Sequence, residues 1–131
     1  MDLDKLLNLA RGALPAAYAP YSGYPVAAAL LTAGGDVFTG VNVENASLGL
    51  TICAERAAVA VAVAGGRRDF SHIAVVAGGE SPPIPCGACR QVLAEFAPAL
   101  QVLVSSRKGE VRAFILEELL PHAFSLPEKS G

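Results

Sequence analysis

The stretch Thr51-Ile52-Cys53-Ala54-Glu55-Arg56 predicts the start of a helix that carries a cysteine and a glutamate, and the fold is predicted outward from it. Its counterpart downstream is Pro85-Cys86-Gly87-Ala88-Cys89-Arg90-Gln91. The two stretches hold all 3 cysteines of the chain, and a glutamate lies two residues after the first of them. Three thiolates can bind zinc and leave its fourth position open, which is typical of a catalytic site. A carboxylate beside that position can move protons, so the pattern indicates a zinc hydrolase acting on a small molecule.

Both stretches are predicted to begin helices that follow strands. Thr51 can cap a helix that runs through Ala64, and a second helix is predicted from about Cys86 to Phe96. Residues i and i+3 share a helix face, so Cys86 and Cys89 can bind one ion from the same helix. We expect the two helix starts to converge at one edge of a sheet, where their positive ends favour thiolates.

The remaining hydrophobic pattern predicts one more long helix, five strands and a short final helix. The long helix covers residues 3–14, and the short one covers residues 116–120. The strands are expected at residues 26–32, 36–43, 73–77, 102–105 and 111–115. Strands alternating with helices predict a single α/β domain over residues 1–131, with three α/β/α layers around a mixed five-stranded sheet. Residues 127–131 are expected to be a frayed tail.

The composition excludes several classes of partner. The charge is −2, from 10 Lys+Arg against 12 Asp+Glu, and no basic run is present, so we expect no nucleic acid partner. The longest apolar run, Ala57 to Ala64, is far shorter than the ~18 residues of a membrane span. The acidic N-terminus lacks the basic head of a signal peptide. An odd number of cysteines with a Cys-x-x-Cys spacing favours a reducing compartment, so a cytoplasmic location is expected.

The apolar content predicts an oligomer. Hydrophobic residues make up 53% of the chain, and the mean hydropathy is +0.45. With glycine counted and tyrosine left out, the apolar share is roughly 60%, against a usual ~45–50%. A small monomer cannot bury that excess, and subunit interfaces are the natural place for it.

Arg56 and Gln91 are expected to support the metal rather than bind it. One Zn²⁺ with three thiolates carries a net negative charge, which opposes the deprotonation of a bound water. Arg56 can donate hydrogen bonds to a thiolate sulfur and withdraw that charge, and Gln91 could orient the arginine.

Three simpler interpretations stay open at this point. The Cys-x-x-Cys could be a redox dithiol, although Cys53 and Glu55 would then be unexplained. A closed structural zinc site would need His72 or His122 as its fourth ligand, and both lie outside the two stretches. Taken alone, Glu55 could be a carboxylate that only stabilises a helix start.

The two cysteine stretches resemble the zinc signature of cytidine deaminases, specifically the small homotetrameric type. The similarity extends to residues 18–22, 41–46 and 117–121 and to Phe124-Ser125, in order and over nearly the whole chain. It implies one zinc ion per subunit, bound by Cys53, Cys86 and Cys89 with water as the fourth ligand. It also implies a homotetramer with sites at subunit interfaces.

The chemistry carried over from this family is the hydrolytic deamination of cytidine and 2′-deoxycytidine, in pyrimidine salvage. Glu55 is expected to take a proton from the water and deliver it to N3 of the cytosine ring. Attack at C4 and protonation of the amino group by Glu55 then release ammonia and leave uridine or 2′-deoxyuridine.

The resemblance also assigns substrate contacts. The Ala54 backbone is expected to hold the base, and Asn42 and Glu44, as a buried amide and carboxylate, the ribose 3′-hydroxyl. Phe124 is expected to reach the site of a neighbouring subunit. Without the resemblance, Asn42 and Glu44 could be a polar strand end, and Phe124 could be a plug of the C-terminal core. Tyr24 keeps the ring of the phenylalanine usual at its position and adds a hydroxyl.

Three further departures from the family pattern are Ala27, Leu48 and Ile84, where glycine, tyrosine and serine are frequent. They affect the expected substrate affinity and interface but not the reaction. Rival functions are a nucleic-acid-editing deaminase, a blasticidin-type deaminase and a metal-binding module without activity. A basic groove would favour the first of these, and the chain shows none.

Overall fold

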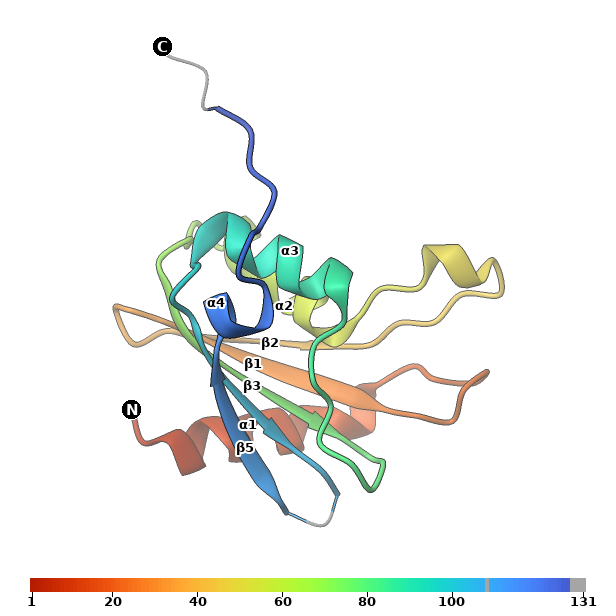
Figure 1. Ribbon diagram of the computed structural model, residues 1–131. Helices are drawn as coiled ribbons and strands as arrows, with labels where there is room; N and C mark the ends of the chain where they lie inside the picture. The colour runs from red at the N-terminus through yellow and green to blue at the C-terminus, as the bar shows by residue number, and fades with distance from the viewer. Residues whose placement is uncertain (108, 128–131) are drawn as a thin grey trace.

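The protein, described here by a computed structural model over residues 1–107 and 109–127, is built around one five-stranded sheet (Figure 1). The strands lie in the order β2-β1-β3-β4-β5. The bounds of the elements are α1 Leu3–Ala13, η1 Leu14–Ala16, β1 Val26–Thr32, β2 Val37–Val41, η2 Leu48–Leu50, α2 Ala54–Ala64, β3 Phe70–Ala77, α3 Gly87–Phe96, β4 Gln101–Ser105, β5 Val111–Ile115 and α4 Leu116–Leu119.

The predicted mixed sheet is confirmed. β1 pairs antiparallel with both β2 and β3, and β4 pairs antiparallel with β5. β3 and β4 are parallel, so the chain between them must cross over, and α3 makes this crossing. That the whole of residues 1–131 is a single domain stays a prediction, and the expected frayed tail lies outside the described residues from 128 onward.

Helices cover both faces of the sheet, which gives the predicted three layers. Figure 1 shows α1 on one face and α2, α3 and α4 on the other. Alternate residues of β1 enter the two cores: Ala28 and Leu30 pack with α2 and α3, whereas Ala27, Ala29 and Leu31 pack with α1. β1 is therefore buried on both faces, which explains its continuous apolar sequence.

Gly40 on β2 allows α2 to approach the sheet closely. A Cβ atom at this position would lie closer than 3.0 Å to Ala58 N and 2.6 Å from Ala54 O, both of them backbone atoms of α2. Because neither the strand nor the helix backbone can move aside cheaply, only glycine fits here. The contact fixes the first turns of α2, where the cysteine and glutamate of the first stretch lie.

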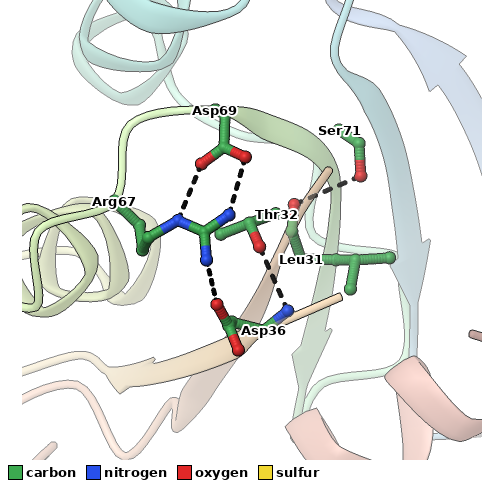
Figure 2. A network of polar contacts seen from close by, with 6 residues as sticks. All are labelled: Leu31, Thr32, Asp36, Arg67, Asp69 and Ser71. Carbon is green, nitrogen blue, oxygen red and sulfur yellow. Dashed lines mark hydrogen bonds and ion pairs between the residues drawn. The ribbon is translucent and has the colours of Figure 1, made fainter. Parts of the chain in front are cut away.

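Arg67, three residues after the C-terminus of α2, connects that end of the helix to the sheet (Figure 2). Its guanidinium binds Asp69, at the entry to β3, through Nε to Oδ1 at 3.0 Å and Nη2 to Oδ2 at 2.7 Å. Its Nη1 pairs with Asp36 in the β1–β2 turn, and Asp36 N–H donates to Thr32 Oγ1 at 3.1 Å. The ion pairs are exposed, so each contributes little to the free energy of folding. The forked guanidinium nevertheless connects the end of α2 with the start of β3 and with the β1–β2 turn.

The start of α2 differs from the prediction. Thr51 is not the cap: its Oγ1 accepts the Asn45 N–H at 3.2 Å, and Ile52 forms an isolated antiparallel bridge with Val43. The helix begins at Ala54 with Cys53 as its N-cap. Pairing of Ile52 with Val43 thus moves the helix start two residues later than predicted.

The other boundaries agree within a few residues. β1 and β5 have the predicted bounds, and Pro15 opens a 3₁₀ turn after α1. β2 ends at Val41, the last residue that pairs with β1, because Val43 forms bridges with Tyr18 and Ile52 instead. β3 begins earlier than predicted, at Phe70. The apolar helix α2 is only half buried in the single chain, since Val61 and Val63 are exposed. Among the described residues, no helix is long and apolar enough to cross a lipid bilayer.

Replacing Gly40 with alanine is expected to destabilise the fold by about 3 kcal/mol, because the added methyl overlaps the α2 backbone. Urea unfolding followed by circular dichroism measures this loss. Gly12→Ala is the matched control: no atom lies within 4 Å of a Cβ there, so the helix should gain up to about 1 kcal/mol. An unchanged unfolding midpoint for Gly40→Ala would contradict the close approach.

Candidate metal centre and substrate cavity

Two helix N-termini bring the three sulfur atoms together. Cys53 is the N-cap of α2, Cys86 is the N-cap of α3, and Cys89 lies in the first turn of α3. The Sγ atoms of Cys53 and Cys86 are 4.0 Å apart, those of Cys86 and Cys89 are 3.5 Å apart, and all three lie within 4.8 Å of one another. Tetrahedral zinc with bonds of about 2.3 Å needs sulfurs about 3.8 Å apart. The spacing therefore fits a zinc ion.

The thiol cluster has three candidate ligands and no fourth. Over residues 1–107 and 109–127, no histidine, aspartate or glutamate joins the cysteine group. His72 lies elsewhere, with Nδ1 3.0 Å from Ser71 Oγ. A closed structural site with a histidine ligand is therefore not what the described residues form, and the fourth position is left for a water or a substrate.

The pKa values of Cys86 and Cys89 are shifted in opposite directions. Burial raises the pKa of Cys86, but hydrogen bonds from the Cys89 and Ala88 N–H groups and from the neighbouring thiols outweigh it, and the net pKa is lowered. Burial also raises the pKa of Cys89, and the charges of Glu55 and Cys53 raise it further. Three crowded thiolates thus repel one another, and a dication among them removes that penalty.

Glu55 is the carboxylate nearest to this cluster. It occupies the second position of α2, is only 5% exposed and contacts Cys89. Burial raises the pKa of its carboxyl, while its own backbone N–H, the Cys89 thiol and the Arg56 charge act in the opposite direction. A carboxyl with a raised pKa exchanges protons more readily near neutral pH, as a general acid and base must. Its burial beside the thiols and its place in the cavity wall are what a general acid and base at this site would require.

Arg56 contacts the cluster as expected, but Gln91 does not orient it. Arg56 Nη2 donates to Cys53 Sγ at 3.7 Å and to the Thr51 carbonyl at 3.2 Å, and the thiolate contact raises the pKa of the guanidinium. Its buried Nε has no partner within the described part of the chain. Gln91 Nε2 donates instead to the Phe124 carbonyl at 2.8 Å, because α3 turns that side chain toward the C-terminal segment.

A cavity of about 260 Å³ opens beside the thiols and Glu55. Its wall comes from loops and helix starts that are distant in sequence. The lining residues are Tyr24, Val26, Asn42, Thr51, Cys53, Ala54, Glu55, Pro83, Ile84 and Cys86. The sequence analysis missed Val26, Thr51 and Pro83 as lining residues, because an apolar strand start, a threonine and a loop proline carry no local signal of a cavity.

Asn42 and Glu44 have structural partners already. Asn42 is buried; its Oδ1 accepts the Val26 N–H at 3.0 Å and its Nδ2 donates to the Tyr24 carbonyl at 2.9 Å. Glu44 is not the buried carboxylate we expected, since the segment that carries it leaves the sheet. Its Oε1 accepts the N–H groups of Tyr21 and Ser22, its Oε2 accepts the Ser22 hydroxyl, and the contacts with Ser22 lower its pKa.

The two aromatic candidates have different positions. Tyr24 lines the cavity of its own chain. Phe124 is 69% exposed, so it is not a plug of the C-terminal core, and it is absent from the cavity wall. The departures at Leu48 and Ile84 also differ: Leu48 is exposed on η2, whereas Ile84 lines the cavity.

Comparison with known proteins identifies the group to which this site belongs. The model of the cytidine and deoxycytidylate deaminase zinc-binding region matches residues 1–105. The chain belongs to this family. It is therefore a zinc-dependent hydrolase that acts on a carbon–nitrogen bond, and the cluster of Cys53, Cys86 and Cys89 is positioned to bind the metal ion.

Two bacterial relatives are similar over nearly their full length. A cytidine deaminase of Sporosarcina psychrophila is 45% identical over 99% of this chain and 96% of its own. One of Halalkalibacterium halodurans is 49% identical over 95% of this chain and 96% of its own. The crystal structure of a cytidine deaminase from Burkholderia pseudomallei superposes with a TM-score of 0.91 at 49% identity, over 95% of this chain and 100% of the other.

The metal centre predicts one zinc ion per chain, bound by all three thiols. Cys89→Ser should lower the zinc content to near zero, because two thiolates with a weak hydroxyl ligand cannot compete with solvent and buffer. Mass spectrometry of metals in the purified protein gives the stoichiometry. His72→Gln and His122→Gln are the controls and should keep the zinc. Loss of zinc in either histidine variant would show that the site has a fourth protein ligand.

Proposed function

We propose that the chain hydrolyses cytidine and 2′-deoxycytidine to uridine and 2′-deoxyuridine with release of ammonia, in pyrimidine salvage. The observation that carries the proposal is the open three-thiol cluster beside the buried Glu55, at the wall of a cavity. Membership of the deaminase family and the similarity to proteins named cytidine deaminase support it.

Glu55 is the proposed catalytic acid and base. Cys53, Cys86 and Cys89 would hold the zinc ion, which would supply the Lewis acidity that makes a water nucleophilic near neutral pH. Glu55 accepts a proton from that water and delivers it to N3 of the cytosine ring, while the water oxygen attacks C4. Glu55 then takes the second proton from the oxygen now bound to C4 and gives it to the amino group, so that the C4–N bond breaks, ammonia leaves and the C4 carbonyl of the uracil ring forms. The raised pKa of the buried carboxyl suits a group that must hold and release a proton in one cycle.

Arg56 is proposed to reduce the negative charge at the metal. Three thiolates outnumber the two charges of zinc, and excess negative charge disfavours the loss of a proton from water. The guanidinium of Arg56 donates to Cys53 Sγ and thereby withdraws electron density from one of the ligands. The buried Nε, which has no partner among the described residues, leaves this side chain one more donor inside the site.

Asn42, Glu44 and the Ala54 backbone are proposed to hold the nucleoside. Asn42 Nδ2 has a second N–H beyond the one that it donates to Tyr24, and a carboxylate can accept more bonds than the three that Glu44 accepts from residues 21 and 22. Both therefore keep hydrogen-bonding capacity for a ribose hydroxyl without giving up their structural bonds; Asn42 lines the cavity, and Glu44 lies two residues further along the chain. Ala54 is fully buried at the helix start and lines the cavity, which suits a backbone contact to the base.

A homotetramer with shared sites is proposed from the exposed apolar surface. The arm of residues 42–53 extends from the body of the molecule and carries Leu48 and Leu50, which are 70% and 66% exposed (Figure 1). The segment after α4 also leads away and carries Phe124 and Leu126. Such surfaces need a partner to exclude water. We propose that Phe124 contacts the base in a neighbouring site, and that the free thiols belong to a reducing, cytoplasmic setting.

Glu55→Gln is expected to keep one zinc ion and to lower kcat by about 10²–10⁴-fold, because the amide cannot move protons. The decrease in cytosine absorbance measures the rate, and mass spectrometry measures the zinc. Glu95→Gln, an exposed change on α3, is the control and should leave both values unchanged.

The substrate panel for the parent protein contains cytidine, 2′-deoxycytidine, free cytosine, blasticidin and a single-stranded oligonucleotide. Turnover of the two nucleosides, with the other compounds poor substrates, is the expected result. No turnover of either nucleoside by the zinc-loaded protein would end the proposal, and full activity of Glu55→Gln would remove that residue from its role.

Mixing two defective subunits tests the role of Phe124. Separately, Phe124→Ala and Glu55→Gln should each have low activity. Mixed oligomers should regain about a quarter of the parental activity, because random pairing joins both intact side chains in one site of four. Light scattering of the same samples gives the subunit number. Activity that stays at the average of the two variants would place Phe124 in its own chain's site, and a monomer would exclude shared sites.

A further inference from the structure

Gly79, just after β3, lies directly against the ring of Tyr24. A Cβ atom at position 79 would be closer than 3.0 Å to Tyr24 Cε2 and 3.3 Å from its Cδ2 and Cζ atoms. The backbone of Gly79 does not require glycine, since its φ lies outside the left-handed region. Glycine is needed here only because the tyrosine ring fills the space that a side chain would occupy.

The backbone on both sides of this contact is held by hydrogen bonds. Tyr24 N–H donates to Ser22 Oγ at 3.0 Å, and the Tyr24 carbonyl accepts from Asn42 Nδ2 at 2.9 Å. On the other side, Gly78 N–H donates to the Pro25 carbonyl at 2.9 Å, and the Gly79 carbonyl accepts the Arg107 N–H at 3.0 Å. A methyl group at position 79 therefore cannot be accommodated by a cheap backbone shift. Rotation of the Tyr24 ring is the soft response.

Tyr24 lines the cavity together with Cys53 and Glu55. We propose that Gly79 is a positioning residue for substrate affinity: it leaves a notch that seats the Tyr24 ring at the position where the ring forms one wall of the nucleoside cavity. The proposal rests on the proposed function, because it takes the occupant of the cavity to be a nucleoside. It adds a residue that neither lines the cavity nor belongs to the cysteine stretches.

The notch acts on binding rather than on the chemical step. The three thiols and Glu55 are positioned by α2 and α3, which do not include residue 24 or residue 79. A displaced ring changes the contact with bound substrate in the ground state and the transition state alike, and a change of this kind appears in KM. It leaves the metal centre and its proton transfer as they are.

Gly79→Ala is the direct test, with zinc-loaded protein and cytidine as substrate. KM should rise on the order of 10-fold, as for a methylene-sized misfit in an apolar pocket, with kcat within about twofold of the parent. Zinc content and unfolding midpoint should be unchanged, because the ring gives way rather than the backbone. Gly12→Ala is the control glycine and should alter neither KM nor kcat.

The second test repeats the change without the ring. In a Tyr24→Ala background, where KM is already raised, Gly79→Ala should have no further effect. An unchanged KM for Gly79→Ala in the parent would overturn the proposal. So would an equal rise of KM in both backgrounds, or a loss of zinc or of kcat that accounts for the defect.

Near-ultraviolet circular dichroism reports the ring without any turnover. The chain has 3 tyrosines and no tryptophan, so a Tyr18→Phe, Tyr21→Phe background leaves Tyr24 as the single tyrosine. Gly79→Ala should change the tyrosine band in that background, and an unchanged band would refute the seating of the ring. If the zinc-loaded parent turns over no nucleoside, the proposed function fails together with the KM effect, while the band still decides whether the notch seats the ring.

Discussion

Three sulfur atoms within 4.8 Å of one another, at the starts of two helices, are the constraint on which the rest of the structure depends. Burial and the nearby charges of Glu55 and Cys53 raise the pKa of Cys89, so the cluster resists losing all its protons on its own. A zinc ion changes that balance and joins α2 to α3. Metal binding would thus stabilise the mutual position of the two helices, and Cys53 and Cys86 already line the same cavity as Glu55.

The sequence was most informative where local pattern and local chemistry coincide. The predicted bounds of β1, a nearly continuous apolar run, and of β5 were correct, and the i, i+3 spacing of Cys86 and Cys89 correctly implied that both thiols meet one ion-sized site. The expected convergence of the two helix starts brought Cys53 to the same site from another helix, and the family resemblance agreed with it. Cysteine thiols and a nearby carboxylate have few common roles in proteins. Their presence at this spacing therefore predicted a metal site without knowledge of the fold.

What the sequence did not reveal depends on contacts between distant segments. α2 begins at Ala54 because Ile52 pairs with Val43, and no local pattern records that bridge. Gly40 and Gly79 look like ordinary strand and loop glycines until the helix and the ring that press on them are known. The exposure of Glu44 and the partner of Gln91 were mispredicted for the same reason, since both depend on where a loop and a terminal segment run.

The order of the cavity residues along the chain bears on how the protein matures. Tyr24, Asn42, Cys53 and Cys86 contribute to one cavity although more than sixty positions separate the first from the last. β1 lies between β2 and β3. It can therefore complete its pairing only after β3 has been synthesised, some forty residues later. During synthesis, therefore, the first 85 residues carry a single thiol, Cys53, and the three-thiol cluster can form only after the start of α3 has been made.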